Sequence, residues 1–385
     1  MKKRSALRGA DIGIHGSFML YASTAVATPM ALLPMAREFS LSFAGGGAIE
    51  IARSLLILAM LLFSGYAAAR WGKIRLMSLG LLTISAGLFA YAAAPGYWMV
   101  LAAMGLIGLG GGLVEALINP LVHDLHPEDA AGRLNHANAY FSLGVCITVL
   151  GAGELLTRGF SWRIIFLVLG TAGLLLTVLF AVSGRKLEVA KSNHSAFHIG
   201  QILGSRRFWI LGIAMFCGGA LEAAFTFWSA SYLQLYFDAL PRGAGVGTAL
   251  FAGGMAAGRM GIARLTRVMG LRQIIMGSAL LGVAVGISAY MIQGIAAFFL
   301  LLAAAGLSVA CYWPTIQIYA ARTMHVDSTL LFIYLSCFGI PGFGITPVIM
   351  GSIADHRSLA MAFGVVPVFS LVLILIMAAD RNHAV

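Results

Sequence analysis

Apolar segments of membrane-spanning length recur along almost the whole chain. Each is about 20 residues long or slightly longer, which is the length that a helix needs to cross the hydrocarbon core of a bilayer. The twelve predicted spans cover residues 12–36, 46–69, 74–94, 98–122, 135–156, 162–183, 208–235, 244–264, 272–292, 294–319, 329–354 and 359–379. The pattern predicts an all-α membrane protein, because helices satisfy their own backbone hydrogen bonds in lipid.

The longest polar stretch, residues 184–198, lies near the midpoint of the chain and divides six spans from six. A basic loop follows the second span at 65–75, and a related loop follows the eighth at 264–272. This repetition predicts two pseudo-symmetric six-helix halves with a substrate site near the bilayer midplane. The predicted divisions are an N-terminal half at 1–183, a cytoplasmic linker at 184–207 and a C-terminal half at 208–385.

Composition and charge favour the same class. Hydrophobic residues make up 60% of the chain and charged residues 10%, whereas soluble domains carry about 25% charged residues. The net charge of +11 comes from basic residues scattered between spans and concentrated on one side, which predicts an inner (plasma) membrane of the bacterial type with both termini cytoplasmic. They form no stripe, so no nucleic-acid partner is expected.

Glu115 and Asn119 are the polar residues that stand out within the apolar, glycine-rich stretch 105–120. An acid within a span is a functional candidate by default. Because the two residues are four apart, they share one face of a helix. We expect them to serve in proton coupling or substrate binding; the alternative is a neutral glutamic acid that closes a hydrogen bond between helices.

The 65–75 loop resembles the signature of the major facilitator superfamily, Gly-x-x-x-Asp-Arg-x-Gly-x-Arg. Gly65, Arg70, Gly72 and Arg75 match it, while Ala69 replaces the aspartate. The resemblance implies gating roles for Arg70, Gly72 and Arg75. It also implies that the acid which normally helps to lock the halves is missing.

Further segments resemble the fucose permease branch of sugar:proton symporters, in order along nearly the whole chain. They are residues 115–120, 127–128, 133–135, 219–222 with Trp228 and Tyr232, 251–259, 312–315, 339–341 and 351–355. This resemblance implies proton symport of a sugar and adds Arg259 and Pro341 to the gating candidates. Two departures are the absence of an acid among the polar residues of the first span, namely His15, Tyr21, Ser23 and Thr24, and Phe141 where the fifth span has an asparagine.

The second half offers its own site candidates. Glu222, Trp228 and Tyr232 combine an acid with aromatic groups, which suits a polyol. Around Pro314, where a proline bends the tenth span, the candidates are Tyr312, Trp313 and Gln317. For each, the alternative is ordinary packing or an interhelical hydrogen bond.

Four other groups of residues leave their roles open. Arg53 can pair with Glu50 one turn earlier or face an anionic substrate. Asn138 is predicted to face the cavity, within a polar face formed with Asn135 and Ser142. Glu154, and Asp355 with His356 and Arg357, are either outer gate partners or solvated charges.

The leading hypothesis is a secondary active transporter that moves a small polar solute, with a sugar as the implied class, by proton-coupled alternating access. The alternatives are an exporter of amphipathic compounds, for which 18 methionines would supply an adaptable cavity, and a non-transporting receptor or assembly protein. The chain shows no nucleophile–base pair, metal spacing or nucleotide loop, so neither an enzyme nor a cofactor is expected. The expected partners are the solute, the proton and the lipid bilayer, and the expected state is a monomer.

Overall fold

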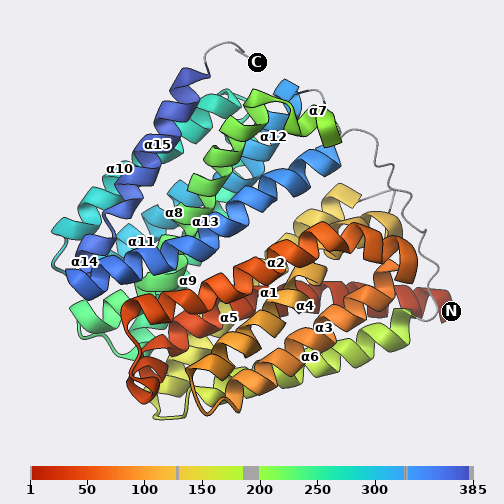
Figure 1. Ribbon diagram of the computed structural model, residues 1–385, viewed down its shortest axis with the longest axis horizontal. Helices are drawn as coiled ribbons and strands as arrows, with labels where there is room; N and C mark the ends of the chain where they lie inside the picture. The colour runs from red at the N-terminus through yellow and green to blue at the C-terminus, as the bar shows by residue number, and fades with distance from the viewer. Residues whose placement is uncertain (1, 127–129, 185–198, 325, 327, 381–385) are drawn as a thin grey trace. The chain divides into compact units, whose positions relative to one another are not determined.

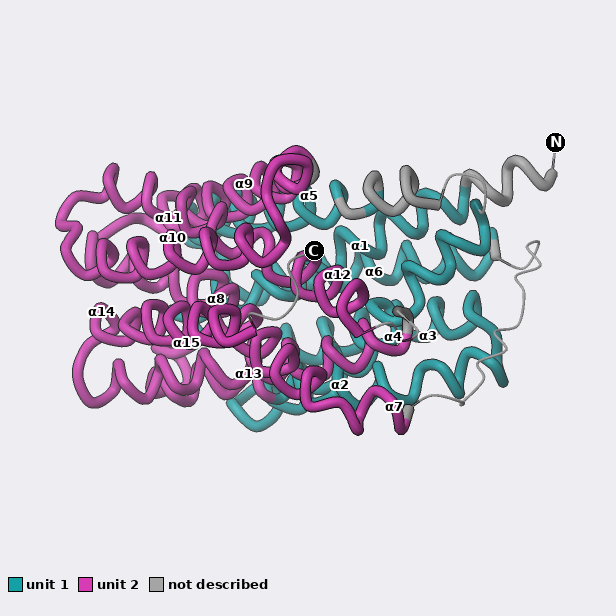
Figure 2. The backbone as a smooth tube through the Cα atoms, turned by 90° about the horizontal axis from the view of Figure 1, so that it is seen from above, with its two compact units in different colours: residues 1–35, 52–195 teal, residues 36–51, 196–385 magenta. Residues whose placement is uncertain are grey.

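The computed structural model describes residues 2–126, 130–184, 199–324, 326 and 328–380, and all regular elements in this part of the chain are α-helices. The chain forms two compact units, shown in two colours in Figure 2. Unit 1 comprises residues 1–35 and 52–195, and unit 2 comprises residues 36–51 and 196–385. The turn between the first two helices therefore packs as part of unit 2.

The helices are labelled in Figure 1. The first six are α1 (Lys2–Phe39), α2 (Phe43–Trp71), α3 (Lys73–Ala92), α4 (Tyr97–Leu125), α5 (Ala130–Thr157) and α6 (Arg163–Gly184). The others are α7 (Ile199–Leu203), α8 (Arg206–Tyr236), α9 (Pro241–Leu265), α10 (Leu271–Met291), α11 (Ile295–Val309), α12 (Tyr312–Met324), α13 (Ser328–His356), α14 (Leu359–Ala362) and α15 (Val365–Ala379).

Every predicted span coincides with helix, and two spans are interrupted. The tenth span divides into α11 and α12 because Pro314 has no N–H to donate to the Ala310 carbonyl. The last span divides into α14 and α15, where Pro367 leaves the Phe363 carbonyl without its helical donor in the same way. Each proline thus divides one predicted helix into two, and the span continues through both.

Eleven segments of the described chain are long and apolar enough to cross a membrane. Of the twelve predicted spans, the one in α9 falls below this hydropathy threshold, because its glycines and Arg259 lower the mean hydropathy. Its 25 residues still match the thickness of a bilayer.

Small residues let helices approach closely inside each unit. In unit 1, a Cβ at Gly110 would lie within 3.0 Å of the Gly80 carbonyl, which joins α3 to α4. In unit 2, Gly219 meets the Gly339 carbonyl and so joins α8 to α13. Backbone contacts of this kind are typical of helix packing in lipid, where van der Waals contact replaces the hydrophobic effect.

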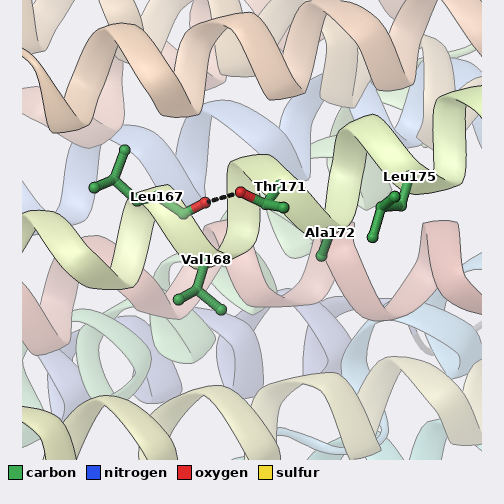
Figure 3. Close-up of a pocket in the computed structure, with 5 residues that line it drawn as sticks. All are labelled: Leu167, Val168, Thr171, Ala172 and Leu175. Atoms are coloured by element: carbon green, nitrogen blue, oxygen red, sulfur yellow. Dashed lines mark hydrogen bonds between the residues drawn. The ribbon is translucent and has the colours of Figure 1, made fainter.

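The outer face of α6 is apolar. A shallow depression on this face is lined by Leu167, Val168, Thr171, Ala172 and Leu175 (Figure 3). The one hydroxyl among them, on Thr171, donates to the Leu167 carbonyl at 2.8 Å. Because this polar group is satisfied within its own helix, the face is suited to contact with lipid chains.

Candidate functional site

An acid, a base and an indole meet within unit 2, on three different helices. The Glu222 carboxylate, on α8, lies beside the indole of Trp313 on α12, a hydrogen-bond donor, and in the electrostatic field of Arg259 on α9. Its Oε2 atom is buried and has no hydrogen-bond partner among the described residues. This carboxylate is therefore held in place while one of its oxygens stays available.

Two glycines explain how α8 brings these groups together. Gly218 lies against the Cβ of Tyr312 on α12, and Gly219 lies against Gly339 on α13. Gly339 also faces the ring of Trp313, within 3.0 Å of a Cβ at that position. Larger residues on α8 at this level would push α12 away and break the contact between Trp313 and Glu222.

Arg259 is a gating candidate from the sequence, and in the structure its charge acts on Glu222. The arginine lies within α9. An arginine placed inside a span is costly unless it is paired. The acid–base combination of Glu222 and Arg259 supplies that compensation and makes Arg259 a member of the site in unit 2.

Gln317, one turn beyond Trp313 on α12, bridges to α13. Its amide nitrogen donates to Ser336 Oγ at 3.2 Å and to the Phe332 carbonyl at 3.4 Å. The donors of this side chain therefore serve the contact between helices, and only its carbonyl oxygen is left for a solute.

Three predicted aromatic site residues are instead buried in the packing of unit 2. Trp228, Tyr232 and Tyr312 are at most 1% exposed. The indole of Trp228 donates to the Pro347 carbonyl at 3.1 Å, and Tyr232 stacks on Phe298 with ring centroids 4.9 Å apart. These contacts favour the packing alternative for the three residues, and their role in substrate binding stays a prediction.

The burial of Trp228 and Tyr232 predicts that their polar groups contribute to stability. Trp228→Phe and Tyr232→Phe are expected to lower thermal stability, because each keeps a ring but removes a polar group from a close-packed core; the tryptophan change costs about 1 kcal/mol through the lost hydrogen bond. The transport KM should not change. Melting of the purified variants and concentration-dependent uptake would test this, and a selective rise in KM at unchanged stability would contradict it.

In unit 1, Glu115 and Asn119 lie on one face of α4, and both are exposed. The residues between them that point the other way, Leu117 and Ile118, are buried in the unit. The face with Glu115 and Asn119 is therefore separate from the apolar core of unit 1. A carboxylate at this depth needs polar surroundings, so the exposed position fits contact with water or a solute.

Arg53 is buried inside unit 1, at 4% exposure. Its guanidinium carbon lies 5.5 Å from the ring centroid of Tyr21 on α1, a cation–π distance. The backbone of Arg53 also meets Gly108 on α4. Glu50, one turn earlier in α2, is buried as well.

A lysine of the signature loop, residues 65–75, forms an ion pair that the sequence did not predict. Gly72 has φ +83°, in the left-handed region that favours glycine, while Arg70 and Arg75 are exposed. Lys73 pairs with Asp124 near the end of α4 at 2.5 Å. Asp124 thus supplies an acid to this loop from the fourth span, although position 69 lacks one.

The remaining candidates are placed as follows. Glu154, near the end of α5, pairs at 2.7 Å on the surface with Arg158, the first residue after that helix. Helix α13 continues unbroken through Pro341, and a Cβ at the adjacent Gly342 would overlap the Phe216 carbonyl of α8. The side chains of Asn138 and Asn135 lie outside the described part of the structure. Asp355 contacts α2 within unit 2, as described below.

Comparison with known proteins agrees with this architecture. Residues 14–243 match the family model of the Major Facilitator Superfamily. An uncharacterized MFS-type transporter of Yersinia pestis is 24% identical over 327 residues, which are 83% of this chain and 81% of the relative. Membrane protein MosC of Rhizobium meliloti is 26% identical over 318 residues, which are 81% and 77% of the two chains.

Solved structures share the fold at low sequence identity. A bacterial homologue of the human lysosomal transporter Spinster, in an inward-facing and occupied conformation, has a TM-score of 0.79 at 14% identity, covering 97% of this chain and 96% of the other. The nucleoside transporter NupG gives 0.79 at 12% identity, covering 98% and 100%. The fucose:proton symporter FucP of E. coli gives 0.66 at 16% identity, covering 97% and 98%.

The matched family model spans more than half of the chain, and the helices have the length, order and small-residue contacts of a twelve-span bundle. Relatives in this family are transporters rather than enzymes. The protein therefore belongs to the major facilitator superfamily, as a multi-pass membrane transporter of a small-molecule solute.

Proposed function

We propose that the protein is a secondary active transporter that moves a small polar solute together with protons by alternating access, with Glu222 as the proton-carrying group. The observation that carries this proposal is the cluster of Glu222, Arg259 and Trp313 inside unit 2. A carboxylate with one partnerless oxygen can take up a proton without first losing a hydrogen bond at that atom.

The cluster couples proton and solute through charge. When Glu222 is ionised, it balances Arg259. When Glu222 is protonated, the guanidinium of Arg259 is left to attract an oxygen of the solute, so that binding of the proton favours binding of the solute. The partly exposed side chain of Trp313 offers an apolar surface to the C–H groups of the same solute.

Glu115 and Asn119 are proposed to bind solute from α4. Carboxylate and amide groups together accept and donate hydrogen bonds, which suits hydroxyl-bearing solutes. FucP is named for fucose and NupG for nucleosides, which are both polyhydroxylated solutes. Sugars and nucleosides are thus the first classes to test, in a protein proposed to lie as a monomer in the inner membrane with both termini cytoplasmic.

Proton flux into proteoliposomes tests the function. A panel of sugars, nucleosides, sugar acids and small carboxylates is added to vesicles that hold the wild-type protein, and internal pH is followed by a trapped dye. We expect one class to drive proton entry. Silence across the panel, in protein shown to be folded and inserted, would overturn proton symport.

Glu115→Gln separates binding from coupling in the same assay. Loss of a charged hydrogen-bond partner is expected to raise the KM for the solute about tenfold, while each solute still brings its proton. Parallel measurement of labelled solute uptake and proton entry gives the ratio. A variant with normal KM and an altered proton-to-solute ratio would instead assign the proton to Glu115.

A further inference from the structure

Residues 36–51 comprise the end of α1, the turn after it and the start of α2. They pack within unit 2, while the residues on both sides belong to unit 1. The first backbone amides of α2 point at a side chain more than 300 positions away. Phe43 N and Ala44 N donate to the two carboxylate oxygens of Asp355, at 2.8 and 2.9 Å. Asp355 stands at the end of α13 and caps α2.

This cap satisfies groups that a helix leaves open. The first N–H groups of any helix lack partners within it, and a carboxylate is favoured at this positive end. Ser42 Oγ accepts from Gly45 N at 3.0 Å, which serves one of the next amides locally. The first two amides depend on α13.

Glycines bring the two helices into backbone contact around the cap. A Cβ at Gly351 would lie 2.5 Å from the Phe43 carbonyl, and one at Gly47 would overlap the Pro347 carbonyl. The ring of Phe43 also packs near Trp228, with centroids 5.8 Å apart. The contact is thus shaped specifically for this segment.

We propose that Asp355 is a gating residue, whose carboxylate holds residues 36–51 on α13 at the end where α2 begins and α13 finishes, and releases them once in each transport cycle. The inference rests on the proposed alternating access. The segment is continuous with unit 1 through Met35 and Ala52, so a movement of unit 1 must strain the contact. The predicted topology makes this end the outer one.

The chemistry of the contact suits reversible opening. Asp355 is exposed, so water can replace the hydrogen bonds of both the carboxylate and the amides when the helices separate. A buried apolar contact would resist separation more strongly. The next two residues have other surroundings. His356 Nδ1 contacts the Ser352 carbonyl of its own helix at 2.8 Å, and Arg357 is exposed.

Thiol accessibility tests the gate without solute or proton gradient. Ser352→Cys, a nearly isosteric change on α13 beside Gly351, is the reporter, and cells are treated with a membrane-impermeant maleimide. Adding Asp355→Ala is expected to raise the labelling rate about tenfold, because two charge-assisted hydrogen bonds of the closed form are lost. Asp355→Asn, which keeps one acceptor oxygen, should give a smaller increase, and Arg357→Ala should give none.

Gly47→Ala tests the same contact by another route. Its methyl group should wedge α2 from α13 and also raise the labelling rate, whereas Gly151→Ala, where a Cβ meets no described atom within 4 Å, should not. The native cysteines are controlled by labelling protein without the reporter. Equal labelling in the wild type, Asp355→Ala and Gly47→Ala backgrounds would overturn the gate. Because the readout needs no proton coupling, it stands or falls separately from the flux assay.

Discussion

Glu222→Gln is expected to abolish proton-driven accumulation of the solute while exchange of solute across the membrane continues. Glutamine resembles the protonated acid in shape and charge, so the site is fixed in its proton-loaded form. Exchange requires only that the loaded carrier reorients. Net accumulation requires the proton to leave, and glutamine has none to release.

The measurement compares two assays on the same proteoliposomes. Uptake of labelled solute driven by an imposed pH gradient should fall to the level of empty vesicles, and counterflow against preloaded unlabelled solute should persist. Glu154→Gln is the matched control, because its carboxylate pairs with Arg158 on the surface, at the end of α5. If Glu222→Gln still accumulates solute, Glu222 is not the proton carrier.

Arg259→Gln extends the test to the partner charge. Removing the guanidinium leaves the Glu222 carboxylate without the charge that now acts on it, and an isolated ionised acid is costly at this depth. The variant should therefore hold Glu222 protonated and, like Glu222→Gln, fail to accumulate solute. Its counterflow should be weaker than that of Glu222→Gln, because it also lacks the guanidinium that is proposed to attract the solute. Normal accumulation by Arg259→Gln would show that the two residues act independently.

The helices could be predicted from the sequence because a single local property determines them. A span must be apolar over about 20 residues, and this property is visible in the chain without knowledge of any contact. The division of the tenth span was partly visible as well, since Pro314 predicts a bend. That the bend would become a break between α11 and α12 depends on the surrounding helices.

The candidate site was harder to predict, because a span carries two kinds of apolar surface. In a soluble helix, the apolar face marks the core. In a membrane helix, lipid-facing and core-facing residues are both apolar. The sequence therefore could not show that Trp228 and Tyr232 pack inside unit 2, while Trp313 is partly exposed and lies beside Glu222. Asp124 was missed for a similar reason, since its link to Lys73 joins residues 51 positions apart.

The packing of α9 on α11 provides a prediction with an internal control. Gly254→Ala is expected to destabilise the protein by about 1–3 kcal/mol, as overpacking does, because a Cβ there would overlap the Ala303 carbonyl of α11. Gly306, on α11, makes the reciprocal approach to the Phe251 carbonyl. Neither backbone can yield without separating the two helices.

The adjacent residue isolates this effect. A Cβ at Gly253 meets no heavy atom of the described structure within 4 Å, and alanine is favoured over glycine within a helix by about 1 kcal/mol. Gly253→Ala should thus leave the melting temperature unchanged or raise it, while Gly254→Ala lowers it, as measured by the fraction that stays monodisperse after heating in detergent. Two identical substitutions one position apart differ only in the face of α9 that they occupy, so equal melting temperatures would contradict the contact between α9 and α11.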